Sequence, residues 1–117
     1  MTGQEPEEIV WQGKFVTAKT RGKWEYVSRS RGIRAAVILA IDAEDHVLLV
    51  EQFRVPLDKP CIELPAGLIG DGDEDEDDET AAARELEEET GYRADRMEVL
   101  GEFWSSPGMV TESYSLL

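Results

Sequence analysis

The chain has 117 residues, of which 41% are hydrophobic and 32% charged, a composition typical of one globular domain. Its 26 acidic residues against 12 basic ones give a formal net charge of −14, which argues against binding to nucleic acid or to an anionic membrane because both are polyanions. The single cysteine, Cys61, excludes an internal disulfide, and no apolar run is long enough to cross a bilayer, so we expect a cytoplasmic protein.

The first half of the chain predicts strands. Residues 1–8 are polar and acidic, and we expect them to be a disordered tail. Runs rich in β-branched, aromatic or continuous apolar residues follow, and turn sequences separate them. The predicted strands are 9–17, 24–28, 35–41 and 47–53. We expect the last two to pair as a hairpin, with 35–41 buried on both faces.

The second half predicts one helix between short strands. Residues 79–90 are rich in alanine, leucine and glutamate, and Gly91 stands where a left-handed cap ends a helix. The other expected elements are a loop at 55–60, a strand at 61–64, a loop at 67–78, a strand at 97–104, a turn at 105–110 and a strand at 112–117.

The predicted helix carries a cluster of carboxylates. At about 100° per residue, Glu85, Glu88 and Glu89 share roughly a third of its circumference, next to an apolar face that includes Leu86. Like charges at this spacing repel each other, and a hard divalent cation with oxygen ligands removes that repulsion. Taken alone, the pattern also fits a solvated acidic face.

The surrounding residues favour the metal-binding interpretation. The string RELEEETGY resembles the REUXEEXG core of the Nudix box, and counting back to Glu76 and Gly70 completes GX5EX7REUXEEXG. The last position departs from the pattern, because Tyr92 stands where an aliphatic residue is usual. The segments VEQFRVPLDKPCIELPAGLIGDG, SSPGMVTE and GKFVTAKTRGKWEYVSR resemble the ADP-ribose pyrophosphatase branch of Nudix hydrolases, so the similarity covers about residues 13–117.

Two glycines compete for the first position of the box. In the ADP-ribose pyrophosphatase branch that position is usually the glycine of PAG, which is Gly67 here. Counted from Gly67, the chain has three extra residues in its acidic stretch 71–78, whereas Gly70 satisfies the pattern literally. We favour Gly67 with an insertion in the loop, because Gly67 belongs to an intact ELPAG.

The resemblance implies a fold and a reaction. The fold is the α/β (α+β) Nudix fold, an α/β/α sandwich with a mixed sheet and the box helix on one face, formed by residues 9–117. The reaction is metal-dependent hydrolysis of ADP-ribose to AMP and ribose 5-phosphate by a homodimer, with Mg²⁺ or Mn²⁺. The alternatives are another nucleoside diphosphate sugar, such as a different ADP-sugar or GDP-mannose, and a non-catalytic nucleotide-binding regulator.

The resemblance also assigns roles to individual residues. The catalytic set is Arg84, Glu85, Glu88 and Glu89, and the metal ligands are the three glutamates and the backbone carbonyl of Ala66. Strands 9–30 supply the dimer contact and the adenine pocket. The substrate-binding set is Phe15 and Trp24 around adenine, Arg29 and Arg54 on phosphate, and Leu68 and Ser106. From the residues alone, the two aromatics also fit the core or a dimer contact, and Arg29 also fits a surface basic patch with Arg21, Lys23, Arg31 and Arg34.

The general base is not among these residues. In the family it comes from a loop in the C-terminal part of the domain, and the family resemblance implies further strands and a helix after Leu117. We therefore expect the C-terminal part of the domain to be missing from this sequence.

Overall fold

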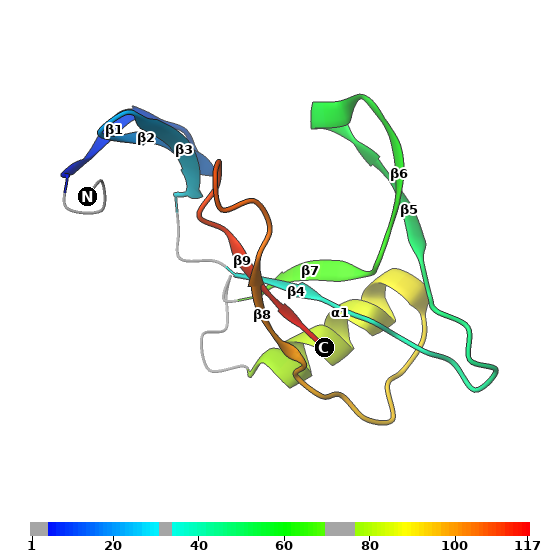
Figure 1. Cartoon of the computed structure of the whole chain (residues 1–117). Coiled ribbons are helices and arrows are strands. Elements are labelled where there is room, and N and C mark those ends of the chain that lie inside the picture. The colour runs from blue at the N-terminus through cyan, green and yellow to red at the C-terminus, as the bar shows by residue number, and fades with distance from the viewer. Residues whose placement is uncertain (1–4, 31–33, 70–76) are drawn as a thin grey trace.

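A computed structural model describes residues 5–30, 34–69 and 77–117 (Figure 1). The N-terminal strands β1 (Glu7–Gln12), β2 (Val16–Arg21) and β3 (Trp24–Arg29) form an antiparallel sheet in that order. Gly22 turns the chain between β2 and β3 with φ of 59°, a left-handed conformation that glycine adopts without strain. In Figure 1 this sheet lies apart from the helix.

A second, mixed sheet carries the helix. Its strand order is β7 (Ala66–Ile69), β4 (Arg34–Val37), β9 (Ser113–Leu116) and β8 (Gly101–Trp104). β4 and β9 run parallel, and the other pairs are antiparallel. Helix α1 (Asp78–Thr90) packs against β7 and β4. It is the one α-helix in the described ranges, and it covers one face of this sheet (Figure 1).

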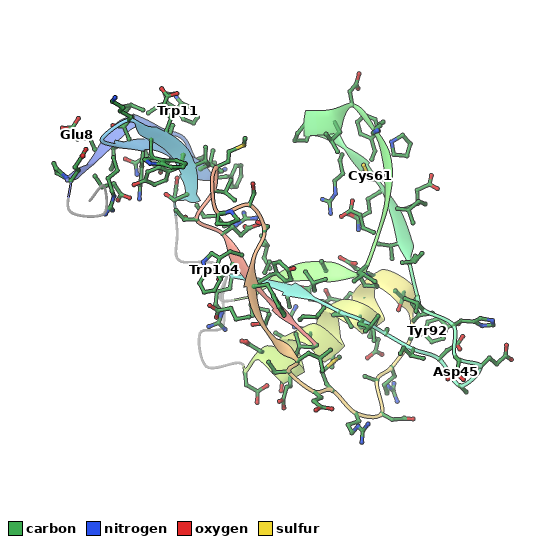
Figure 2. All side chains as sticks on the ribbon, in the orientation of Figure 1. Glu8, Trp11, Asp45, Cys61, Tyr92 and Trp104 are labelled. Carbon is green, nitrogen blue, oxygen red and sulfur yellow. The ribbon has the colours of Figure 1, made fainter. Side chains whose placement is uncertain are left out.

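A two-stranded hairpin projects from the body. It consists of β5 (Val50–Arg54) and β6 (Lys59–Glu63), joined by the short 3₁₀ segment η2 (Val55–Leu57). Figure 2 shows Cys61 on this hairpin, away from Tyr92, which follows α1. The hairpin positions Arg54 near the body of the domain, where it lines a cleft described below.

The core lies between α1 and the mixed sheet. Its members are small or aliphatic and almost fully buried: Ala36, Ile38, Ile69, Ala81, Ala82, Leu86 and Leu117. Ala81 and Ala82 have no exposed surface, and their short side chains let the helix approach the sheet closely. Burial of this apolar surface is what holds α1 on β7 and β4.

Both ends of α1 are capped. The Asp77 side chain accepts a hydrogen bond from the Thr80 amide at 2.7 Å, which satisfies one of the free donors of the first turn. Gly91 ends the helix with φ of 78°, and its amide donates to the Glu87 carbonyl at 2.9 Å. The helix and its glycine cap are confirmed, with a start one residue earlier than predicted.

The N-terminal sheet is joined to the mixed sheet through the segment between β8 and β9. The Val27 amide donates to the Met109 carbonyl at 2.8 Å, and the Thr111 amide donates to the Val27 carbonyl at 3.0 Å. One residue later, Glu112 forms an ion pair with Arg29 of β3. These contacts hold β3 of the N-terminal sheet beside the segment that leads into β9 of the mixed sheet.

Several predicted strands are shorter or differently paired. The strand predicted at 9–17 is two strands, because the chain turns at Gly13, whose amide donates to the Val16 carbonyl at 2.8 Å. β1 also begins at Glu7, inside the predicted tail, where ion pairs with Lys19 and Arg21 hold it. Residues 1–4 of that tail lie outside the described residues.

The hairpin predicted between 35–41 and 47–53 forms only next to its turn. An isolated antiparallel bridge joins Ile41 to Val47, and the Asp42 and Leu48 amides donate to the His46 and Ala40 carbonyls, each at 3.0 Å. Beyond it, β5 pairs with β6 instead, because the strand β6 that follows η2 returns directly alongside it. Ile41 is 59% exposed, so the apolar run is not buried along its whole length. The loop predicted at 55–60 contains η2 and the start of β6.

The long loop predicted at 67–78 begins with a strand. β7 pairs with β4 along its full length, in a register that places Gly67 opposite Ala36. The glycine content of this segment suggested a loop, but a glycine also suits a strand that another element approaches closely. The acidic stretch, Gly70 and Glu76 included, lies outside the described residues up to residue 76. The strands predicted at 97–104 and 112–117 are confirmed in their shorter forms, β8 and β9.

Candidate active site

A cleft of about 560 Å³ gathers predicted site residues from four separate elements, β3, β5, β7 and α1. Its other walls come from β4, from β9 and from the segment before β9. The predicted residues that line it are Arg29, Arg54, Ala66, Leu68 and Glu89. A larger hollow of about 720 Å³ lies between residues 38–43 and 92–97, but it contains none of the predicted site residues. The chemistry of the lining, rather than volume, therefore identifies the candidate site.

Both arginines in the cleft are held by carboxylates. Arg54 donates to Glu63 through Nε at 2.6 Å and through Nη2 at 2.7 Å, a bidentate pair across the hairpin. Arg29 pairs through Nε with Glu112. The Arg54 pair lowers the pKa of the Glu63 carboxyl and raises the pKa of the guanidinium, so both groups stay charged. A guanidinium has five N–H donors, and three remain for a ligand when Arg54 holds Glu63.

The helix carboxylates lie beside the cleft. Arg84 contacts Glu85 at 3.3 Å and Glu88 at 3.7 Å. The Glu85 side chain is only 16% exposed. Its burial, and then repulsion from Glu88 and Glu89, raise the pKa of Glu85, while Arg84 opposes the shift. The site thus holds a desolvated carboxylate next to two others of the same sign.

Glu85 lies directly against the backbone of Gly67. A Cβ added at Gly67 would collide with the carboxyl group of Glu85 and would stand 2.5 Å from its Cγ. Only glycine leaves room for Glu85 in this position. The contact supports the interpretation in which Gly67 is the box glycine, and the alternative, Gly70, lies outside the described residues.

The remaining predicted residues do not line the cleft. Trp24 lies in a neighbouring hollow of about 370 Å³, which it shares with Glu7, Arg21 and Tyr26 of the N-terminal sheet. Phe15 follows β1 and is 70% exposed. Ser106 is outside both hollows, and its neighbour Ser105 lines the cleft instead. In the structure of a single chain, the two rings predicted to stack on adenine therefore do not line the cleft that contains Arg29 and Arg54.

Two acidic residues at the site were not predicted from the sequence. Glu112 lines the cleft and pairs with Arg29, and Glu63 holds Arg54. Both belong to segments that carried the resemblance, Glu63 to ELPAG and Glu112 to SSPGMVTE. A cation at a buried or cleft position is usually matched by a carboxylate, so the sequence indicates that each arginine has such a partner but does not identify it.

The donor set suits a hard divalent cation. The Glu85, Glu88 and Glu89 carboxylates and the Ala66 carbonyl offer only oxygen, which Mg²⁺ and Mn²⁺ prefer. In residues 5–30, 34–69 and 77–117, no three acidic, histidine or cysteine side chains converge closely enough to hold a metal ion. The Glu88 side chain is 58% exposed, so it is free to change rotamer.

Comparison with known proteins identifies the family. The NUDIX domain family model matches residues 31–116. The chain is 46% identical over 78 residues to the methanol dehydrogenase activator of Bacillus methanolicus and 42% identical over 78 residues to the ADP-ribose pyrophosphatase of Bacillus subtilis (strain 168). Each match covers 67% of this chain and 40% of the relative.

A solved structure shares the fold. The crystal structure of an ADP compounds hydrolase superposes with a TM-score of 0.75 at 23% sequence identity, over 95% of this chain and 62% of that one. The curated relatives are longer than this chain, which spans between 40% and 56% of the length of those it matches. Within the described ranges, no helix is long and apolar enough to cross a bilayer.

Proposed function

The chain belongs to the NUDIX domain family, and from this premise we propose that it hydrolyses a nucleoside diphosphate linked to another moiety. The favoured substrate is ADP-ribose, which water splits into AMP and ribose 5-phosphate. One observation carries the proposal: a single cleft joins two arginines to the box helix, with Arg29, Arg54 and Glu89 on three different elements. The similarity to the ADP-ribose pyrophosphatase of Bacillus subtilis supports the choice of substrate.

The arginines bind and orient the diphosphate. Arg54 keeps its Nε and one Nη2 hydrogen on Glu63, which leaves the outer edge of the guanidinium for phosphate oxygens. Arg29 lines the same cleft from β3, and its ion pair with Glu112 orients its guanidinium. Two fixed cations on separate elements hold the linkage in one orientation, which favours attack on one phosphorus.

Nudix hydrolases generally depend on a divalent metal, and we propose Mg²⁺ or Mn²⁺ here. Glu85, Glu88, Glu89 and the Ala66 carbonyl would hold the metal. When bound there, it would neutralise the diphosphate and activate the attacking water. The buried Glu85 side chain lies against Gly67, and this contact would fix the position of the metal relative to the cleft. Arg84 keeps Glu85 and Glu88 oriented on the helix surface.

We also propose that the active form is a homodimer built on the N-terminal sheet. Exposed apolar side chains gather there, including Ile9, Trp11, Phe15 and Trp24, and Figure 2 shows Trp11 far from the box helix. Burying such surface against a second copy is favourable. The partner would bring a second aromatic ring to the adenine. A cytoplasmic location stays a prediction from the sequence.

The test compares matched substrates and matched variants. AMP release is measured from ADP-ribose with Mg²⁺, beside GDP-mannose and a nucleoside triphosphate. Glu89→Gln should lower kcat by about 100-fold or more, because loss of one metal ligand costs several kcal/mol of transition-state stabilisation. Glu87→Gln is the control: it removes the same charge two residues away, where the side chain contacts Arg93 at 3.6 Å.

The outcomes separate two functions. Preferential turnover of ADP-ribose that depends on Glu89 and not on Glu87 supports the hydrolase. Binding of ADP-ribose without turnover, unaffected by Glu89→Gln, would instead support a nucleotide-binding regulator. Similarity to the methanol dehydrogenase activator is the observation that keeps this second function in view. No binding and no turnover of any of the three compounds would refute both.

A further inference from the structure

The first turn of α1 is fastened to the two central strands of the mixed sheet. The Asp78 carboxylate accepts a hydrogen bond from Arg34 Nη2 of β4 and another from Ser115 Oγ of β9, the latter at 3.0 Å. Ser115 is only 6% exposed, and the Asp78 side chain is 25% exposed. The buried Ser115 hydroxyl therefore donates its hydrogen bond to the helix, and the Asp78 carboxylate connects α1 to both β4 and β9.

The contact of Asp78 with Ser115 and the contact of Glu85 with Gly67 lie on the same row of paired residues across the mixed sheet. Gly67 of β7 pairs with Ala36 of β4, and Ala36 pairs on its other side with Ser115 of β9. Residues paired in this way point to the same face of a sheet. Glu85 lies over one end of the row, at Gly67, and Asp78 binds its other end, at Ser115.

The spacing of the two contacts fits an unbent helix. Asp78 and Glu85 are seven residues apart, which is about 10.5 Å along an α-helix. The row from β7 to β9 spans two strand spacings, or about 9.6 Å. The two contacts thus define both the rotation and the axial position of α1 on the sheet.

Apolar packing alone would define that position poorly. The buried face of α1 consists of Ala81, Ala82 and Leu86, so two of its three side chains are single methyl groups. Hydrophobic contact has no direction, whereas hydrogen bonds to a carboxylate are directional. A smooth alanine face can slide by a fraction of a turn, and the hydrogen bonds of Asp78 prevent it.

We propose that Asp78 is a positioning residue for the proposed hydrolysis, acting through Glu85 and Glu89 and touching neither substrate nor metal. It sets where the box helix lies on the sheet, and so where these two carboxylates stand relative to Gly67 and the cleft. The inference rests on the proposed function for its catalytic consequence, but its structural part stands on the contacts of Asp78 alone.

The test uses Asp78→Asn and the milder Ser115→Ala, with Glu79→Gln as control. Glu79 is the exposed neighbour in the same turn, so its replacement removes the same charge without touching the sheet. Each variant is measured at a temperature where circular dichroism shows it fully folded. Asp78→Asn should lower kcat by about 10- to 100-fold and weaken Mn²⁺ binding, followed by electron paramagnetic resonance, by about tenfold. KM should change less, because Arg29 and Arg54 lie on other elements.

A purely structural role would give another pattern. If Asp78→Asn lowers the melting temperature but leaves kcat and Mn²⁺ affinity unchanged in the folded protein, the positioning role is refuted. Equal losses in Glu79→Gln would refute it as well, because the effect would then be one of charge. If Asp78→Asn does not fold, Ser115→Ala decides, since it removes one hydrogen bond and leaves the ion pair with Arg34.

A further readout separates this inference from the proposed function. The amide resonance of Gly67 in a ¹⁵N–¹H spectrum reports the carboxylate that lies against it. A shift of this resonance in Asp78→Asn or Ser115→Ala, and not in Glu79→Gln, supports positioning even if the wild type hydrolyses nothing and binds no Mn²⁺. An unchanged resonance refutes positioning, whatever the activity of the enzyme.

Discussion

Replacing Gly67 by alanine should abolish most of the activity while leaving the fold intact. The new Cβ would stand 2.5 Å from Glu85 Cγ and would collide with the carboxyl group beyond it. Ordinary carbon–carbon contact lies at about 3.5–4.0 Å, so Glu85 has to retreat by about 1 Å or more. A misplacement of about 1 Å at a reacting group can cost about 100-fold in rate, or about 2.7 kcal/mol of transition-state stabilisation.

The fold should tolerate this change because Gly67 needs no special backbone conformation. Its φ is outside the left-handed region, and alanine in a strand restricts the unfolded chain more than glycine does. We therefore expect a melting temperature within a few degrees of the wild type, measured beside kcat for ADP-ribose and the dissociation constant for Mn²⁺. Gly101→Ala is the control, since it adds the same methyl group to β8 of the same sheet, where the partly exposed Phe103 can give way. Full activity in Gly67→Ala would show that the position of Glu85 is not what the reaction requires.

Three further predictions concern the helix. Gly91→Ala should lower the free energy of unfolding by about 1 kcal/mol in urea titrations, because alanine is strained at φ of 78° and nothing else lies within 4 Å of the new methyl group. Asp77→Ala should destabilise the protein at pH 7 and lose its effect as the pH falls through the folded-state pKa. Hydrogen bonds from Thr80 lower that pKa below its ordinary 3.8, and a carboxyl with a lowered folded pKa stabilises only while ionised; unfolding at pH 7 and pH 3 measures the difference. For Glu85 the pH dependence should be opposite to that for Asp77, because burial raises the pKa of Glu85 above 4.5. With EDTA present, the wild type should lose stability as the pH rises through that pKa, and Glu85→Gln should not. An unchanged difference between Glu85→Gln and wild type from pH 4 to pH 7 would contradict the raised pKa.

Local sequence signals predicted the helix better than the sheets. The box helix is fixed by residues close in sequence: alanines that pack, Asp77 that caps and Gly91 that ends it. Strand pairing depends on partners far along the chain, and the apolar runs at 35–41 and 47–53 are equally compatible with pairing each other or third strands. The parallel pairing of β4 with β9 joins residues nearly 80 positions apart, and no local sequence pattern predicts it.

In the candidate site too, residues close in sequence were predictable and long-range contacts were not. The residues that share a motif, from Arg84 to Glu89, could be named from their spacing and the family resemblance. The partners of Arg29 and Arg54 could not be named from the sequence. Glu112 is 83 positions from Arg29, and Glu63 reaches Arg54 only because β5 and β6 pair as a hairpin. The contacts of Asp78 were not predicted from the sequence either, because its partners Arg34 and Ser115 come together only in the folded sheet.

The charges around the cleft support the proposal that a metal ion binds there. Arg29 and Arg54 line the cleft and are already paired with Glu112 and Glu63, and Arg84 on α1 is paired with Glu85 and Glu88. With Glu89, which also lines the cleft, these carboxylates outnumber the three arginines. A diphosphate brings further negative charge into a chain whose net charge is −14. The protein's own cations would therefore orient the proposed diphosphate substrate without neutralising it, and the excess of carboxylates favours the proposed divalent metal ion.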